Sequence, residues 1–303
     1  MREIPVLLLT FRRPEMVRQQ LELLAAAGPL RCYVACDGPR TGNWAEAQAV
    51  ASVQSVVAEY AKHLDLRTQF QEVNLGCGRG VSTAINWFFE CETEGIILED
   101  DCHPSAGFFA FCVELLERYR NVSHVMQIAG YNRLSPLDWI DSDYIFSNYG
   151  CQWGWATWRR AWDHFDLKMA GWPRFKEHGL HGGPTFNPER IRLLDATYAG
   201  AVDTWDYQWA FAMAAQSGLS VVPRVNLVTN VGFEGPGGTH YGQGSRRPQR
   251  NPAVGKLPIP LRHPDFFYAD PEYDRRMVEA SKKPALPIRA WRRLRDITKS
   301  RRG

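Results

Sequence analysis

The chain has 303 residues, of which 45% are hydrophobic and 12% aromatic, enough apolar material for one large domain with a sizeable core. Its 36 Lys and Arg residues and 33 acids leave a net charge of +3, so a nucleic-acid-binding protein, which needs a concentrated basic face, is not indicated. No apolar stretch reaches the roughly 18 residues of a membrane-spanning helix. The 7 scattered cysteines complete no zinc motif and favour free thiols in a cytoplasmic protein.

Strand and helix patterns alternate along the first hundred residues. We expect a buried strand at residues 5–10 and further strands at residues 31–38, 66–73 and 95–100, with an amphipathic helix at residues 14–28 and helices at residues 43–63 and 81–92. This alternation predicts an α/β fold in which a mixed, mostly parallel central sheet is flanked by helices.

The pattern changes after Pro104. We expect helices at residues 105–120 and 204–218, and apolar strand-like runs at residues 125–132, 144–150, 219–223 and 225–232. Residues 171–188 are rich in Gly, Pro and His and indicate an irregular excursion. Residues 233–245 have the composition of a mobile loop.

Polar or glycine-rich groups follow each of the first four expected strands. They are residues 10–12, Asp37–Gly38, residues 74–79 and the acidic run Glu99–Asp100–Asp101. Ligands of open α/β sheets bind beyond the carboxyl ends of the strands, so these groups are expected to share one rim.

The acidic run lies in "GIILEDDCHP", residues 95–104. Alternation along a strand would place Glu99 and Asp101 on one side and Asp100 on the other. Mn²⁺ or Mg²⁺ prefers oxygen ligands, and one or two carboxylates suffice where a diphosphate supplies the remainder. The alternative is an acidic cap for the helix that begins near Ser105.

Two neighbouring strand ends carry weaker signals. "NLGCGRG", residues 74–80, lacks the spacing of a dinucleotide fingerprint, although its Arg79 suits contact with a phosphate or a base. Asp37 of "CDG" could accept hydrogen bonds from a base or a ribose, or could simply form an Asp-Gly turn.

Aromatic residues concentrate in "CQWGWATWRRAW", residues 151–162, where the tryptophan spacing changes from two to helical. Trp153, Gly154 and Trp155 could form an acceptor platform, because aromatic faces pack on sugar rings and glycine allows close approach. A core role for the tryptophans is the alternative.

In "DTWDYQW", Asp203 and Asp206 share a helix face. Asp203 suits a helix N-cap, whereas Asp206, flanked by Trp205 and Trp209, could act as a general base.

In this order, "PVLLLTFRRP", "ACDGPR", "ILEDDCHPSAGFFAF", "QWGWATW", "TWDYQWAF" and "GTHYG" resemble inverting glycosyltransferases with the GT-A (Rossmann-like) nucleotide-sugar-binding fold. The resemblance is to the N-acetylglucosaminyltransferase I type and to bacterial family 2-like or HlpA-like transferases, and it spans residues 5–242. It implies a catalytic domain at residues 1–265, with a nucleotide-sugar-binding half at 1–103 and an acceptor-binding half at 104–265, followed by an extension at 266–303.

The resemblance also implies roles for individual residues. Asp206 corresponds to the catalytic base and Asp101 to the direct ligand of Mn²⁺ or Mg²⁺. The residues that would bind the nucleotide sugar are Thr10, Arg12, Asp37, Arg79, Glu99, Asp100, Trp205 and His240.

The implied reaction moves a sugar from a nucleotide-sugar donor, a UDP-sugar first, to a glycan or lipid-linked acceptor by single displacement. A sugar-phosphate nucleotidyltransferase and a non-catalytic carbohydrate-binding protein are the alternatives; the first would carry a glycine-rich loop where this chain has "TFRRPE". The basic segment at residues 289–303 fits either an amphipathic helix on the inner face of the cell membrane or a solvated terminus.

Overall fold

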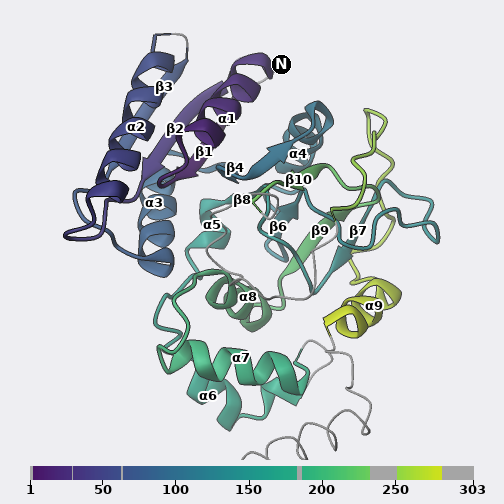
Figure 1. Ribbon diagram of the computed structural model, residues 1–303. Coiled ribbons are helices and arrows are strands. Elements are labelled where there is room, and N and C mark those ends of the chain that lie inside the picture. Colours follow the sequence, from purple (N-terminus) through teal and green to yellow (C-terminus); the bar gives the residue numbers. More distant parts are fainter. Residues whose placement is uncertain (1–2, 29, 63, 183–185, 233–250, 282–303) are drawn as a thin grey trace, which may run out of the picture.

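The structure, a computed structural model, describes residues 3–28, 30–62, 64–182, 186–232 and 251–281. These residues form an eight-stranded mixed sheet with the strand order β3-β2-β1-β4-β8-β6-β9-β7, and a two-stranded sheet of β10 and β5 (Figure 1). The strands are β1 (Ile4–Thr10), β2 (Leu30–Cys36), β3 (Asp65–Phe70), β4 (Glu94–Glu99), β5 (Cys102–Pro104), β6 (Val125–Ala129), β7 (Tyr144–Ser147), β8 (Trp155–Trp158), β9 (Leu219–Pro223) and β10 (Val228–Asn230).

Helices cover both faces of the large sheet. They are α1 (Pro14–Ala26), α2 (Trp44–Tyr60), α3 (Cys77–Cys91), α4 (Ala106–Arg118), α5 (Arg159–Trp162), α6 (Trp172–Glu177), α7 (Pro188–Tyr198), α8 (Asp206–Ala215) and α9 (Pro271–Ser281). On β1, Val6 and Leu8 pack in the core that includes α1, α2 and α4, whereas Leu7 and Leu9 pack in the core that includes α3, α5 and α8. Both faces are buried, which explains the continuous apolar run of this strand.

The predicted α/β fold is confirmed. Strands β3, β2, β1 and β4 are parallel, and their carboxyl ends lie at one edge, with Thr10 opposite Cys36 and Leu9 opposite Glu99. Strand β8 is antiparallel to both β4 and β6, so the sheet is mixed. The tryptophan segment changes from strand β8 to helix α5, as its spacing indicates.

Two regions are more ordered than the sequence indicated. Helix α6 and the short 3₁₀ helix Leu180–Gly182 lie within the expected irregular excursion, and Trp172 of α6 is fully buried in a separate apolar cluster. Helix α9 lies beyond the expected domain boundary at residue 265, yet its Tyr273 is buried against β7 and β9 residues. The main fold therefore extends to α9, while residues 282–303, including the basic segment, lie outside the described residues. Within the described part of the chain, no helix is long and apolar enough to cross a membrane.

Candidate functional site

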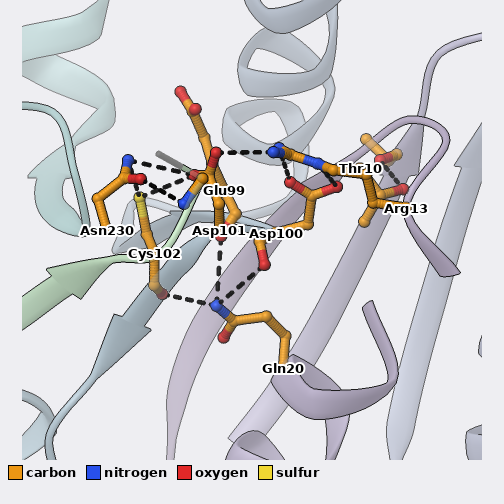
Figure 2. Close-up of polar contacts among 10 residues, drawn as sticks. Thr10, Arg13, Gln20, Glu99, Asp100, Asp101, Cys102 and Asn230 are labelled. Carbon is orange, nitrogen blue, oxygen red and sulfur yellow. Dashed lines mark hydrogen bonds and ion pairs between the residues drawn. The ribbon is translucent and has the colours of Figure 1, made fainter. Parts of the chain in front are cut away.

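The acidic run forms a tight turn between the two sheets. Strand β4 ends at Glu99, Asp100 and Asp101 form the turn, and β5 begins at Cys102 and pairs with β10. Gln20 of α1 is fully buried and donates its Nε2 hydrogens toward this turn, with the shortest contact 2.6 Å from the Cys102 carbonyl (Figure 2). Helix α1 therefore stabilises the backbone of the turn that carries Asp100 and Asp101.

Arg13, at the end of the β1 segment, neutralises part of the acidic run. Its guanidinium forms a bidentate ion pair with Asp100, and its Nη1 donates to Asp101 Oδ2 at 2.9 Å (Figure 2). Asp100 is only 2% exposed, and burial raises its pKa to about 6, against the opposing effect of Arg13. These contacts join the acids to the neighbouring strand, and among the described residues the α4 N-cap has no side-chain hydrogen bond.

Glu99 has the most strongly raised carboxyl pKa of the turn. Burial raises this pKa to about 8, and the charges of Asp101, Asp100 and Asp206 add to the effect, whereas Arg13 opposes it. No group in the described part of the chain donates a hydrogen bond to the Glu99 carboxyl. The start of α8 lies near β4, because Trp205 stacks on Trp155, which pairs with Ile97 of that strand.

Asp206 is the first residue of α8 and is oriented from its own segment. Its Oδ1 accepts hydrogen bonds from the Thr204 hydroxyl and, at 2.9 Å, from the Tyr207 amide. Its Oδ2 has no hydrogen-bond partner in the described ranges. One oxygen is thus held in place while the other can accept a proton or a hydrogen bond.

Asp203 does not cap α8, contrary to the sequence expectation. The α8 N-cap residue is Trp205, and the Asp203 carboxylate instead accepts hydrogen bonds from the amides of Cys77 at 2.9 Å and Gly78 at 2.8 Å. These amides belong to the first turn of α3, whose own N-cap residue, Gly76, makes no capping hydrogen bond. Asp203 therefore joins the loop after β3 to the segment that carries Asp206.

Asp37 holds the loop after β3. Its carboxylate accepts hydrogen bonds from the amides of Gly38 and Leu75 and from the side chain of Asn74, each at 2.9 Å. Burial raises the pKa of Asp37, and the backbone donors partly offset this rise. Both oxygens are thus engaged in shaping the loop.

The remaining residues expected to bind a nucleotide sugar have different surroundings. Thr10 is buried and donates its hydroxyl to the Ala35 carbonyl at 2.9 Å, while Arg12 pairs with the buried Glu46 at 3.2 Å. Arg79 is exposed in the first turn of α3, and its guanidinium has no partner among the described residues. His240 lies outside the described residues.

The tryptophans mainly form core behind the rim, which corrects the expectation of an acceptor platform at Trp155. Trp155 is 0% exposed and stacks on Trp205, itself 3% exposed, with ring centroids 5.6 Å apart. Gly154 has φ +63° and is buried, and a Cβ there would lie 2.9 Å from a Val228 methyl group, so this glycine permits internal packing. Trp153 is half-buried and packs edge-on against Tyr131.

A divalent cation fits this rim only with ligands from outside the protein. Across the described ranges, no group of three or more His, Cys, Asp or Glu side chains is arranged to hold a metal. Asp101 offers hard oxygen atoms, but its Oδ2 is paired with Arg13 and its Oδ1 lies 3.3 Å from the Asn230 amide nitrogen. Water and phosphate oxygens would have to complete the coordination shell.

Sequence reasoning missed several residues of the rim. Arg13 stands beside the selected Arg12 in "TFRRP", and Gln20 is a polar residue on the buried face of an amphipathic helix, which is the signal that could have identified it. Asn230 and Thr204 offered no local signal, because their partners are distant or become relevant only in the folded chain. No protein-family model matches the chain, and no curated protein matches it.

Proposed function

We propose that this protein is a metal-dependent, inverting glycosyltransferase of the GT-A fold. It transfers a sugar from a nucleotide sugar, with a UDP-sugar as the first candidate, to a hydroxyl of a glycan or lipid-linked glycan. One observation carries the proposal: Glu99, Asp100 and Asp101 lie together at the carboxyl end of β4, with Asp206 close enough to affect Glu99, although burial and repulsion raise the pKa values of Glu99 and Asp100.

Clustered acids of this kind are costly unless a cation or a proton accompanies them. Arg13 supplies one positive charge, and a divalent cation held by Asp101 would relieve the remaining repulsion. Bound there, Mn²⁺ or Mg²⁺ would stabilise the charge of the departing nucleoside diphosphate.

The chain's own residues account for the other parts of the proposed reaction. The unpartnered Oδ2 of Asp206 accepts the proton of the acceptor hydroxyl, while Thr204 and the Tyr207 amide hold the other oxygen. Arg79, exposed at the start of α3, is placed to contact a phosphate or the base. Glu99, whose carboxyl interacts electrostatically with Asp206, would face the donor sugar.

The GT-A assignment draws support from the strand order. The parallel strands β3, β2, β1 and β4 provide a nucleotide-binding half, and the antiparallel β8 joins them to a second half that carries Asp206. In the proposed reaction, the first half would bind the donor and the second half, which carries Asp206, would bind the acceptor.

Calorimetric titration of a panel of nucleotide sugars, with and without Mn²⁺, tests the proposal. We expect one UDP-sugar to bind with Mn²⁺ and to bind at least tenfold more weakly without it. Asp101→Asn should weaken donor binding in the presence of Mn²⁺ to the level seen without it. Asp206→Asn should leave donor binding intact and abolish sugar transfer. The exposed Asp163→Asn is the matched control. Absence of nucleotide-sugar binding under all conditions would refute the proposal.

Two product assays, for pyrophosphate and for released nucleotide, separate the two alternative functions. A nucleotidyltransferase would bind a nucleoside triphosphate and release pyrophosphate, whereas a carbohydrate-binding protein would release no nucleotide from any donor.

A further inference from the structure

An open cleft of about 590 Å³ lies on the face of α8 that is turned away from the tryptophan core. Its α8 wall consists of residues with helical spacing, namely Gln208, Phe211, Ala212, Ala215 and Gln216. Trp209 and Met213, which lie between them in sequence, pack into the tryptophan core, and Ala212 lies at the boundary and contributes to both. Helix α8 therefore presents one face to the protein interior and another to this cleft.

The opposite wall comes from the helical excursion around α6. It includes His164, Arg174 and His178, together with the apolar Phe175 and Leu180. Figure 1 shows α6 and α7 gathered beside α8, apart from the strands that carry the acidic rim. A cleft of this volume falls within the range of small-ligand sites, about 300–1,000 Å³.

Basic and hydrogen-donating side chains line the cleft, and they have no interaction partner among the described residues. The side chains of His164, Arg174 and His178 make no hydrogen bond or ion pair with other described residues, and all three are exposed. The described lining also contains one acid, Asp166, whose oxygens accept the amides of Lys168 at 2.9 Å and Ala170 at 2.7 Å. Arg174 makes no ion pair with it or with any other described residue, so its guanidinium is the group of the cleft that is available to pair with a ligand carboxylate.

At the floor of the cleft, one buried side-chain oxygen lacks a hydrogen-bond donor among the described residues. Gln208 is 4% exposed; its Nε2 donates to the Thr204 carbonyl at 2.7 Å, while its Oε1 is buried without a partner in the described residues. A buried amide oxygen without a donor is costly, and a ligand hydroxyl could satisfy it after a small side-chain movement. Phe175 and Phe211 supply aromatic surface beside it.

We infer that this cleft binds an acidic saccharide, a sugar unit that carries a carboxylate. Aromatic rings at the floor would contact the C–H faces of the sugar, Gln208 would accept a hydroxyl hydrogen bond, and Arg174 would pair with the carboxylate. Through Gln208 and Thr204, the cleft is connected by two hydrogen bonds to the Asp206 carboxylate. The binding does not depend on the proposed function; if that function holds, the cleft receives a section of the acceptor chain.

The test compares trigalacturonate with its fully methyl-esterified form, which has the same shape and no charge, by calorimetry on the full chain without nucleotide or metal. We expect the acid to bind at least tenfold more tightly than the ester, and Arg174→Ala to remove that difference. Arg192→Ala, which deletes an exposed arginine of α7 outside the cleft, is the matched control and should keep it.

Three results would overturn the inference: equal binding of acid and ester, binding of neither, or displacement of the saccharide by inorganic phosphate at equal concentration. The last would identify a general anion site. Titration of a UDP-sugar with Mn²⁺ on Arg174→Ala should match the unmodified protein, so loss of saccharide binding and failure of the proposed transferase function remain distinguishable.

Discussion

The long-range cap provided by Asp203 makes a specific prediction about stability. Replacement of Asp203 by alanine removes the acceptor of the Cys77 and Gly78 amides, which lie at 2.9 and 2.8 Å in the first turn of α3. No side chain adjacent to this helix can replace it, since Gly76 occupies the N-cap position.

The size of the effect follows from the two hydrogen bonds and the charge. Loss of an N-cap acceptor costs about 1 kcal/mol, and loss of a negative charge at a helix N-terminus costs about a further 0.5 kcal/mol. Asp203 is exposed, so water can partly replace it, and we expect a total loss of about 1–1.5 kcal/mol in the free energy of unfolding. For a chain of 303 residues, the melting temperature should fall by about 1.5–2.5 °C. Asp203→Asn retains an acceptor and should lose about half as much.

Urea denaturation and amide hydrogen exchange measure the global and local parts of this effect. Exchange should accelerate at residues 77–80 in Asp203→Ala, while the exposed Asp163→Ala, with the same change in charge, should leave it unchanged. Normal exchange at residues 77–80 together with an unchanged melting temperature would show that the hydrogen bonds to Asp203 do not hold α3.

Three further predictions concern the rim and its support. In the metal-free protein, the free energy of unfolding should fall as pH rises from about 5 to about 8. The reason is that Glu99 retains its proton in the folded state over this range and loses it in the unfolded state. In a series of urea titrations at different pH values, Glu99→Gln should flatten this decrease. Arg13→Met should destabilise the protein by about 3 kcal/mol at pH 8, since it leaves Asp100 buried without its cation, and an unchanged urea midpoint would contradict the ion pair. Gly154→Ala should cost about 1–3 kcal/mol because of its φ of +63° and a Cβ contact of 2.9 Å. Gly107→Ala, in α4, should be neutral or stabilising in thermal denaturation, because an added Cβ there would meet only Ser105 Oγ, at 3.9 Å.

The first half of the fold could be predicted because its signals are local. Strands β1, β2 and β4 are buried on both faces and read as continuous apolar runs, whereas the edge strand β3 is mostly exposed; helices follow β1, β2 and β3 directly along the chain. The rule that parallel strands end at one edge then placed the acidic run beside the ends of β1 and β2. The antiparallel β8 and the pairing of β5 with β10 were not predicted, because short strands take their partners from distant parts of the chain.

The candidate site shows the same limit. Asp203 was assigned to the nearest helix by spacing, but the chain brings the start of α3 within hydrogen-bonding distance of it. Trp155 suited either a platform or a core from sequence alone; burial between α5 and α8 decides for the core. The positions of Asp203 and Trp155 are set by contacts with segments that are distant in the sequence, which the residue type and its sequence neighbours do not reveal.

Arg13 makes the acidic run compatible with folding by pairing with two of its acids, Asp100 and Asp101. Strand β1 lies next to β4 in the sheet, so an arginine just beyond β1 can reach both Asp100 and Asp101 from the adjacent strand. A single guanidinium cannot offset four neighbouring acids: the pKa of Glu99 stays raised to about 8, so this side chain keeps its proton at neutral pH, and no described residue donates a hydrogen bond to it. Packing alone would favour an apolar residue at such a position. A buried acid that stays protonated for want of a cation is therefore best understood as a binding feature, which is why the proposed function begins from these acids and not from the fold.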